Sequence, residues 1–371
     1  MATDIPRAKV LAYRAAAQGL HREGTAVGRL AVLDLGVQDT PAGAAAHALA
    51  NRLATPAQNP TDDPSLVATW TIRGAPHVHR RRDLDGLARA LWPNNDADAL
   101  TRMNNAAQQV DAAGLGGLQT LSLLAEQMTA VVDGPTPKGE ASTRLTPRVP
   151  AGLTVDCRRC QATHVHDGLF RLAVLPAGIT FAPGQRTVTF EPNPGWPGIP
   201  QATTGLAELI AAYQRLLGPA TRADAAAFIG TRAGELDPWW PDEAVEVDRG
   251  GKRAYAMADS LDLLEDPPDP PEVRLLPPSD PLLQARDREL LVPDPAHRKV
   301  LWPILGKPGT LLVRGDVAGI WRARRQGRKV RMEVQPLRRL SAAVRRATED
   351  EAGLLALTRG ATDAQVSFED A

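Results

Sequence analysis

Two cysteines and two histidines lie within one short segment and have the spacing of a metal site. They are Cys157, Cys160, His164 and His166, arranged as Cys-x2-Cys-x3-His-x-His. A Cys-x2-Cys turn presents two thiolates, a histidine on the next strand can reach back to them, and zinc binds both ligand types. The alternative is a pair of cysteines buried as small apolar side chains, with surface histidines. The segment therefore predicts either a structural zinc site or no metal.

A second group of polar side chains surrounds a predicted hairpin in the segment WTIRGAPHVHRR. Its candidates for contact with nucleic acid are Arg73, His77, His79 and Arg80. Because side chains alternate along a strand, His77 and His79 share one face. A basic hairpin can enter a groove of DNA or contact the phosphates beside it. The alternative is a solvated run of charge.

Cations also gather at two later turns. The segment VEVDRGGKRAYAM alternates around Gly250-Gly251, as a tight hairpin does, and its tip carries Arg249 and Lys252. The stretch RRQGRK places Arg324 and Arg325 at another tight turn. Both turns are suited to phosphate contact. The alternative is a solvated turn, which at 324–329 would protect the edge of a sheet.

The stretch YQRLLGPATRADAAAFIG predicts two helices joined by a short turn. Gly218 sits where a left-handed C-cap residue belongs, and Pro219 forbids continuation of the first helix. Thr221 is a good N-cap for a second helix over Arg222 to Ile229. With the hairpin that follows, this order of elements is typical of a winged helix. Winged helices bind DNA and also serve as protein-interaction domains, so both roles stay open here.

Composition limits the kinds of partner. The formal net charge over 371 residues is zero, so the whole protein does not attract nucleic acid by its field. Affinity for DNA must come from segregated charge, and the chain is strongly basic from Arg314 to Arg346. Two cysteines argue against a disulfide scaffold. Without a membrane-length apolar run or a secretory signal, we expect a cytoplasmic, nucleoid-associated protein without membrane contact.

The predicted fold class is α+β, with tandem winged-helix units and a C-terminal β-rich, barrel-like domain. The order helix, turn, helix, hairpin occurs first in 26–80 and again in 203–257. Residues 310–337 alternate as a three-stranded meander, a helix from Ser341 to Leu357 packs on it, and the residues after it are expected to fray. The expected domains are 1–133 (helical, with the candidate active site), 134–202 (linker and Cys/His β segment), 203–272 (winged helix) and 273–371 (β-rich).

Three stretches carry a resemblance to a known family: WTIRGAPHVH, YQRLLGPATRADAAAFIG and VRLLPPSDPLL. Over about residues 10–337 the chain resembles the winged-helix DNA glycosylases of the AlkZ/YcaQ type. The resemblance implies tandem winged helices that form a basic concave surface for duplex DNA, followed by a small β-barrel. It also implies hydrolysis of the N-glycosidic bond of bulky alkylated purines, including unhooking of interstrand cross-links, without a cofactor.

The family's active-site motif is a polar pair two residues apart, Gln-x-Gln or Gln-x-Asp. The matching stretch here is LGVQDTP, in which Gln38 falls on the second position and Gly36 on the first. An N7-alkylated base is already a cationic leaving group, so the enzyme must mainly hold a water near C1′ and stabilise positive charge on the sugar. We expect Gln38 to orient the water and Asp39 to supply charge. The alternative is that Asp39 only caps a helix beginning at Thr40-Pro41.

The leading prediction is a monomeric, monofunctional DNA glycosylase acting on double-stranded DNA. The absence of a side chain at Gly36 favours a second possibility, a non-catalytic member that binds DNA as a regulator or damage sensor. A third is an interaction module with no nucleic-acid role. Affinity for duplex DNA that falls steeply with salt would exclude the third.

Overall fold

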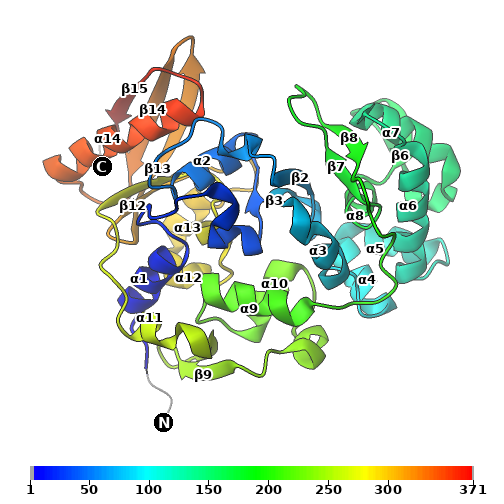
Figure 1. Ribbon diagram of the computed structural model, residues 1–371, viewed down its shortest axis with the longest axis horizontal. Coiled ribbons are helices and arrows are strands. Elements are labelled where there is room, and N and C mark those ends of the chain that lie inside the picture. The colour runs from blue at the N-terminus through cyan, green and yellow to red at the C-terminus, as the bar shows by residue number, and fades with distance from the viewer. Residues whose placement is uncertain (1–3, 370–371) are drawn as a thin grey trace. The chain divides into compact units, whose positions relative to one another are not determined.

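The computed structural model describes residues 4–369, which fold into two compact units (Figure 1). The first unit contains the chain up to Asp63, Ile210–Ala225 and the chain from Pro241 onward. The second unit contains Pro64–Leu209 and Ala226–Trp240. Across the described range, fourteen α-helices and fifteen strands give a mixed α/β fold. The division differs from the four consecutive domains expected, because the chain leaves each unit and returns to it.

A five-stranded sheet forms the C-terminal part of the first unit. Its strands, in spatial order, are β11 (Val273–Leu276), β12 (Gly309–Val313), β13 (Asp316–Gln326), β14 (Lys329–Pro336) and β15 (Asp363–Phe368). The predicted meander is β12 to β14, and its turns contain Arg314, Gly315 and Gly327 at φ values of 50, 79 and 58°. Because β11 and β15 do not pair with each other, the sheet is a half-barrel rather than a closed barrel.

The end of the described chain is ordered β-structure, so the prediction that it frays was wrong. Helix α14 (Ala342–Thr358) begins at Ser341, whose hydroxyl accepts a hydrogen bond from the Val344 N–H at 3.2 Å. The helix returns the chain so that β15 pairs in parallel with β14. Alternate residues Ala364, Val366 and Phe368 pack on the core of the sheet. This apolar alternation stabilises a strand that looks polar and short in the sequence.

The first unit contains further short helices and strands. They are α1 (Arg7–Ala17), β1 (Val37–Gln38), α2 (Ala44–Ala50), α11 (Leu261–Glu265), α12 (Arg288–Leu291), α13 (Pro295–Leu301) and the antiparallel hairpin of β9 (Ala244–Asp248) and β10 (Arg253–Met257). At the start of 26–80, where the predicted order of elements begins with a helix, the chain forms two short 3-10 helices, Val27–Arg29 and Ala31–Asp34.

Two helices joined by a short turn precede the β9–β10 hairpin, as predicted. They are α9 (Leu206–Leu217) and α10 (Arg222–Ile229). Thr221 and Asp224 cap α10 reciprocally: the Asp224 N–H donates to the Thr221 hydroxyl at 3.0 Å, and the Thr221 N–H donates to the Asp224 carboxylate at 2.9 Å. Gly218 is not left-handed, in contrast to the expectation. Instead, a Cβ at Gly218 would lie 2.2 Å from the Gln214 carbonyl oxygen, so the position requires glycine for close approach.

The second unit contains a large apolar core. Its elements are the hairpin of β2 (Leu66–Trp70) and β3 (Pro76–Arg80), the helices α3 (Leu84–Ala90), α4 (Asp96–Met103), α5 (Ala107–Ala112), α6 (Gly117–Val131), α7 (Lys138–Leu145) and α8 (Asp167–Leu172), and the strands β4 (Thr136–Pro137), β5 (Thr154–Cys157), β6 (Ala162–Val165), β7 (Ile179–Phe181) and β8 (Thr189–Pro192). The stretch 134–150 is not a linker. It contains α7, whose Ala141 and Leu145 are fully buried in the core, a periodicity hidden by the surrounding Pro, Gly and Thr.

Candidate functional site

Gln38 and Asp39 lie at the end of β1, just before α2, and both are half-buried. The Asp39 carboxylate accepts a hydrogen bond from the Ala45 N–H, 3.0 Å from Oδ1. Burial raises the pKa of Asp39 above its ordinary value, and hydrogen bonds from the N–H groups of Ala45, Gly43 and Ala44 oppose that shift. The helix begins at Ala44 rather than at Thr40-Pro41, with Gly43 at its N-cap position, and the Asp39 carboxylate binds its first turn through the Ala45 N–H.

Gly36 takes a backbone conformation that explains its identity. Its φ is 78°, in the left-handed region that side chains with a Cβ rarely adopt. A glutamine at this position would therefore be strained. The lack of a side chain at Gly36 thus has a local conformational reason.

A cationic cavity of about 380 Å³ lies within the first unit, and Pro41 forms part of its wall. The charged residues that line it are five cations and one acid: Lys307, Arg322, Arg324, Arg331, Arg359 and Glu333. Strand alternation produces this arrangement, because Met332 and Val334 of β14 face the core while Arg331 and Glu333 face outward. Pro41 is two residues from Asp39, so the candidate catalytic segment approaches the cavity.

Trp321 closes one side of this cavity. Its ring is 2% exposed, lies 5.9 Å from the Arg359 guanidinium and meets His47 edge-on at 6.2 Å between centroids. A Cβ on Gly309 would overlap the Trp321 ring, so glycine is needed there. The Trp321 Nε1–H has no hydrogen-bond partner within residues 4–369. The cavity thus combines an aromatic ring with positive charge.

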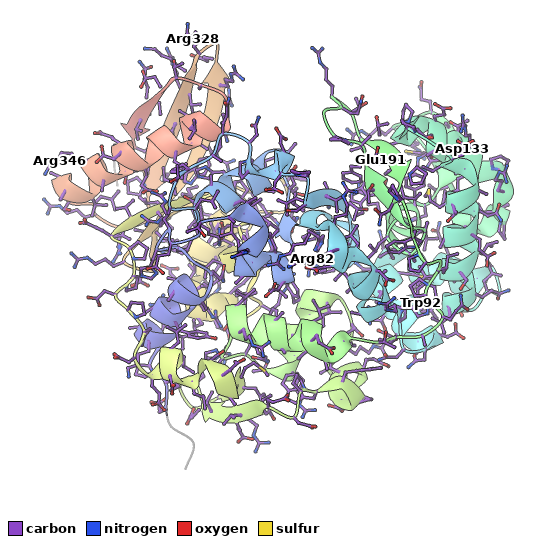
Figure 2. All side chains as sticks on the ribbon, in the orientation of Figure 1. Arg82, Trp92, Asp133, Glu191, Arg328 and Arg346 are labelled. Atoms are coloured by element: carbon purple, nitrogen blue, oxygen red, sulfur yellow. The ribbon has the colours of Figure 1, made fainter. Side chains whose placement is uncertain are left out.

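The hairpin of β13 and β14 extends this positive charge outward. Arg324, Arg325 and Arg328 are exposed around the Gly327 turn, and Figure 2 shows Arg328 at the free end of the hairpin. Arg325 bonds locally, because its Nε–H donates to the Gly327 carbonyl at 3.0 Å. The tip of this hairpin is therefore a positively charged surface. The structure thus leaves Arg324 and Arg325 exposed at the predicted turn.

The β2–β3 hairpin exists as predicted, but its histidines are core residues. His77 and His79 are 3% and 2% exposed, and the Thr71 hydroxyl lies 3.0 Å from both His77 Nδ1 and His79 Nε2. Burial lowers the pKa of His77 to about 4 and holds the pKa of His79 well below its ordinary value. Both imidazoles are therefore neutral at pH 7, and the prediction that they contact DNA is not supported.

Arg73 and Arg80 of the same hairpin differ in exposure. Arg80 is 8% exposed and its guanidinium donates to Asp83 at 3.2 Å, which places it inside the unit. Arg73 is exposed, donates to the Phe228 carbonyl and lines a second cavity of about 270 Å³ together with Arg102. Of the four predicted contacts on this hairpin, only Arg73 reaches a surface.

The tip of the β9–β10 hairpin also departs from the prediction. Arg249 is 8% exposed and shares the carboxylate of Asp287 with the fully buried Arg14. It also donates to the Pro219 carbonyl at 2.8 Å, so it ties the hairpin to the turn between α9 and α10 instead of reaching phosphate. Lys252 is exposed but paired with Glu289 at 2.8 Å. The Gly-Gly turn gives no hint of this burial, because Asp287 is far away in sequence.

The comparison with family sequence models decides the assignment. The model of the AlkZ-like DNA glycosylases matches residues 28–357, which is most of the chain. The chain belongs to the AlkZ-like DNA glycosylase family. Among solved structures, the DNA glycosylase AlkZ of Streptomyces sahachiroi matches with a TM-score of 0.75 at 21% sequence identity, covering 99% of this chain and 100% of that chain. That likeness shows the fold. A comparison with curated proteins finds no match.

Membership in the AlkZ-like family makes DNA the substrate class. Four cations that line the cavity were not predicted as site residues from the sequence, namely Lys307, Arg322, Arg331 and Arg359. The alternation of β13 and β14 carried a signal for Arg322 and Arg331, because both occupy the face opposite the apolar positions. Lys307 and Arg359 come from other elements, so only the folded sheet brings them to the cavity.

Three of the four predicted metal ligands lie together in this AlkZ-like protein. The donor atoms of Cys157, Cys160 and His164 are all within 4.8 Å of one another. Hydrogen bonds from the Cys160 N–H and from His164 lower the pKa of Cys157 to about 7. His166 is excluded from the cluster, because its Nδ1 accepts the Gly168 N–H at 3.2 Å and so caps α8.

None of the helices within residues 4–369 is long and apolar enough to cross a membrane.

Proposed function

We propose that this AlkZ-like protein is a monofunctional DNA glycosylase that hydrolyses the N-glycosidic bond of alkylated purines, including cross-linked ones. The observation that carries the proposal is that Pro41, which follows Gln38 and Asp39 by two or three residues, lines a cationic cavity. Such a cavity suits a nucleotide taken out of the duplex, because cations hold its phosphates. No cofactor is required.

The proposed chemistry needs charge and a placed water rather than a strong acid. Alkylation at N7 gives the purine a positive charge, so it departs without full protonation, and the sugar develops positive charge in the transition state. Asp39 supports that charge from a position fixed by the Ala45 N–H. Gln38 orients the water that attacks C1′, because its amide both donates and accepts hydrogen bonds. Capping and catalysis are compatible, since a carboxylate can accept several hydrogen bonds.

The proposal also includes a shift of the polar pair by two residues along the chain, from positions 36 and 38 to positions 38 and 40. Because position 36 requires glycine, the side chains available two residues apart are Gln38 and Thr40, on either side of Asp39. Thr40 is exposed and precedes Pro41 of the cavity wall. We include the Thr40 hydroxyl as a second candidate for holding the water.

Binding to duplex DNA is proposed to use the β13–β14 hairpin, with Arg324, Arg325 and Arg328 on phosphates. The helix pair α9–α10 with the β9–β10 hairpin is proposed to act as a winged-helix unit, and a second such unit is proposed for 26–80. The protein is proposed to act as a monomer. These assignments rest on the order of elements and on exposed charge.

A DNA-binding protein without catalysis is the second candidate, favoured by the missing side chain at Gly36 and by the capping bond of Asp39. Duplexes with N7-methylguanine, with a nitrogen-mustard cross-link and without damage distinguish the two. Release of the methylated base or unhooking of the cross-link supports the glycosylase. Salt-sensitive binding that leaves every base intact would establish the second candidate and overturn the first.

A further inference from the structure

The hairpin formed by β5 and β6 places sulfur and nitrogen atoms together at its tip. Cys157 pairs with Ala162 and Val155 pairs with His164, so these four side chains share one face of the hairpin. Cys160 lies in the turn between the strands, which is closed by Gln161 at a φ of 52°. The two thiols are free, and they lie beside the imidazole of His164.

The His164 ring is already oriented as a metal ligand. Its Nδ1 lies 2.8 Å from the Val165 carbonyl oxygen and can only donate to it, which leaves Nε2 as the unprotonated nitrogen. Histidines that bind metals commonly donate their other ring N–H to a backbone carbonyl in this way, because the bond fixes both tautomer and orientation. A surface histidine whose ring is solvated by water does not need this hydrogen bond to the Val165 carbonyl.

The spacing of the three donors is close to that of a tetrahedral site. Zinc–sulfur and zinc–nitrogen bonds of about 2.3 and 2.0 Å place ligand atoms about 3.5 to 3.8 Å apart. The donors here lie within 4.8 Å of one another, so side-chain rotations that move the donor atoms by about an ångström close the site. Two thiolates with one imidazole favour zinc over calcium or magnesium, which prefer oxygen.

The tip of the hairpin is exposed. β5 and β6 form a separate two-stranded sheet of four residues each. Leu153 and Val165 are buried and anchor its base, whereas Cys160 and Gln161 are exposed. An isolated two-stranded hairpin is marginally stable in water, so a cross-link at the tip would stabilise it.

We propose that Cys157, Cys160 and His164 bind a single zinc ion that fixes the tip of the β5–β6 hairpin. Within the described part of the chain no fourth protein ligand joins the three, so water or an added ligand completes the coordination. The site is independent of the proposed glycosylase chemistry. It corrects the four-ligand prediction, because His166 is occupied with the N-terminus of α8.

Metal content and spectroscopy of the full chain test the proposal. Protein stripped by a chelator and dialysed against zinc is expected to retain one equivalent, measured by elemental analysis. Cobalt(II) added to the stripped protein is expected to give thiolate charge-transfer and tetrahedral ligand-field bands. Cys157→Ser and His164→Ala should lower zinc affinity at least tenfold, and His166→Ala, a matched histidine two residues away, should leave the stoichiometry unchanged.

Amide hydrogen exchange in the hairpin distinguishes zinc bound at this site from zinc adsorbed elsewhere on the protein. Zinc is expected to slow amide hydrogen exchange in residues 154–165 of the wild-type protein, a measurement that needs no variant to fold. Absence of bound zinc, absence of the charge-transfer bands, or unchanged exchange in this segment would each overturn the proposal. So would a Cys157–Cys160 disulfide that forms readily in air in the presence of equimolar zinc, because zinc-bound thiolates are protected from oxidation.

Discussion

Arg52 and Asp280 form a bidentate ion pair with both side chains fully buried. The guanidinium donates to the two carboxylate oxygens at 2.9 and 3.0 Å. Asp280 belongs to the stretch VRLLPPSDPLL, which carried part of the family resemblance, and Arg52 follows helix α2. The aspartate of that stretch is therefore structural. It holds in place the helix that Asp39 caps at its other end.

Removing one partner of this pair is expected to destabilise the first unit strongly. Asp280→Ala leaves the Arg52 guanidinium buried and unpaired, which costs about 3–5 kcal/mol in the free energy of unfolding. Urea denaturation followed by circular dichroism measures the loss. Asp85→Ala is the control, because the Asp85–Arg89 pair is half-exposed and is expected to change stability by less than about 1 kcal/mol. Equal effects of the two substitutions would contradict the structural role of Asp280.

Acid is expected to destabilise the protein through its buried histidines. Burial lowers the pKa of His47 and of His77 to about 4, whereas an unfolded histidine titrates near 6.5. The unfolded state therefore binds more protons between these values. Stability from the neutral rings is fully present above about pH 6.5 and is lost as the pH falls towards about 4, by roughly 1.4 kcal/mol per pH unit for each ring.

Denaturant midpoints between pH 4 and 8 check this expectation. His77→Gln keeps a polar group beside Thr71 and should reduce the slope below pH 6.5, although it lowers stability at every pH. A slope that is unchanged in His77→Gln would show that His77 does not contribute. Stability that rises as the pH falls through this window would contradict the burial of both rings.

Gly36 offers a test of the backbone interpretation. Gly36→Ala forces a Cβ into the left-handed region and should cost about 1–2 kcal/mol in the free energy of unfolding. Gly353 is the matched control, since it is exposed on α14 and a Cβ added there would meet no atom within 4 Å. Gly353→Ala should stabilise the helix by about 1 kcal/mol. A neutral or stabilising Gly36→Ala would show that glycine is not required there.

The basic hairpin is expected to dominate electrostatic binding to DNA. Arg324→Ala with Arg328→Ala should weaken affinity for undamaged and damaged duplexes alike, and should lower the slope of log K against log salt by about 0.9 for each phosphate that is no longer neutralised. Arg346→Ala, an exposed arginine on α14 away from the hairpin tip in Figure 2, is the control. Fluorescence anisotropy at several salt concentrations measures both quantities. An equal loss of affinity in Arg346→Ala would contradict a hairpin-specific interaction.

The sequence was informative wherever local chemistry decides the structure. The Thr221 cap, the helix that follows Ser341 and the turn at Gly327 follow from neighbouring residues and were predicted correctly. The family resemblance was also confirmed. Local propensity is a good guide in these cases because the interaction partners are a few residues apart.

Predictions failed where a distant partner decides. Arg249 looks solvated in the sequence, yet it is buried against Asp287, which also pairs with Arg14. His77 and His79 look like a basic pair, yet the Thr71 hydroxyl and the core make them neutral. The cationic cavity joins Pro41, Lys307 and Arg359, which no spacing rule connects. Burial and long-range pairing change the meaning of the same residue types.

Single-turnover release of N7-methylguanine from duplex DNA tests the central claim most directly. Wild type would be compared with Gln38→Ala, Asp39→Asn and Thr40→Ala, with duplex affinity and thermal stability measured for each variant. We predict that wild type releases the base and that Asp39→Asn lowers the rate at least a hundredfold while duplex affinity is unchanged. Undiminished release by all three variants, or no release by the wild-type protein, would contradict the proposed site.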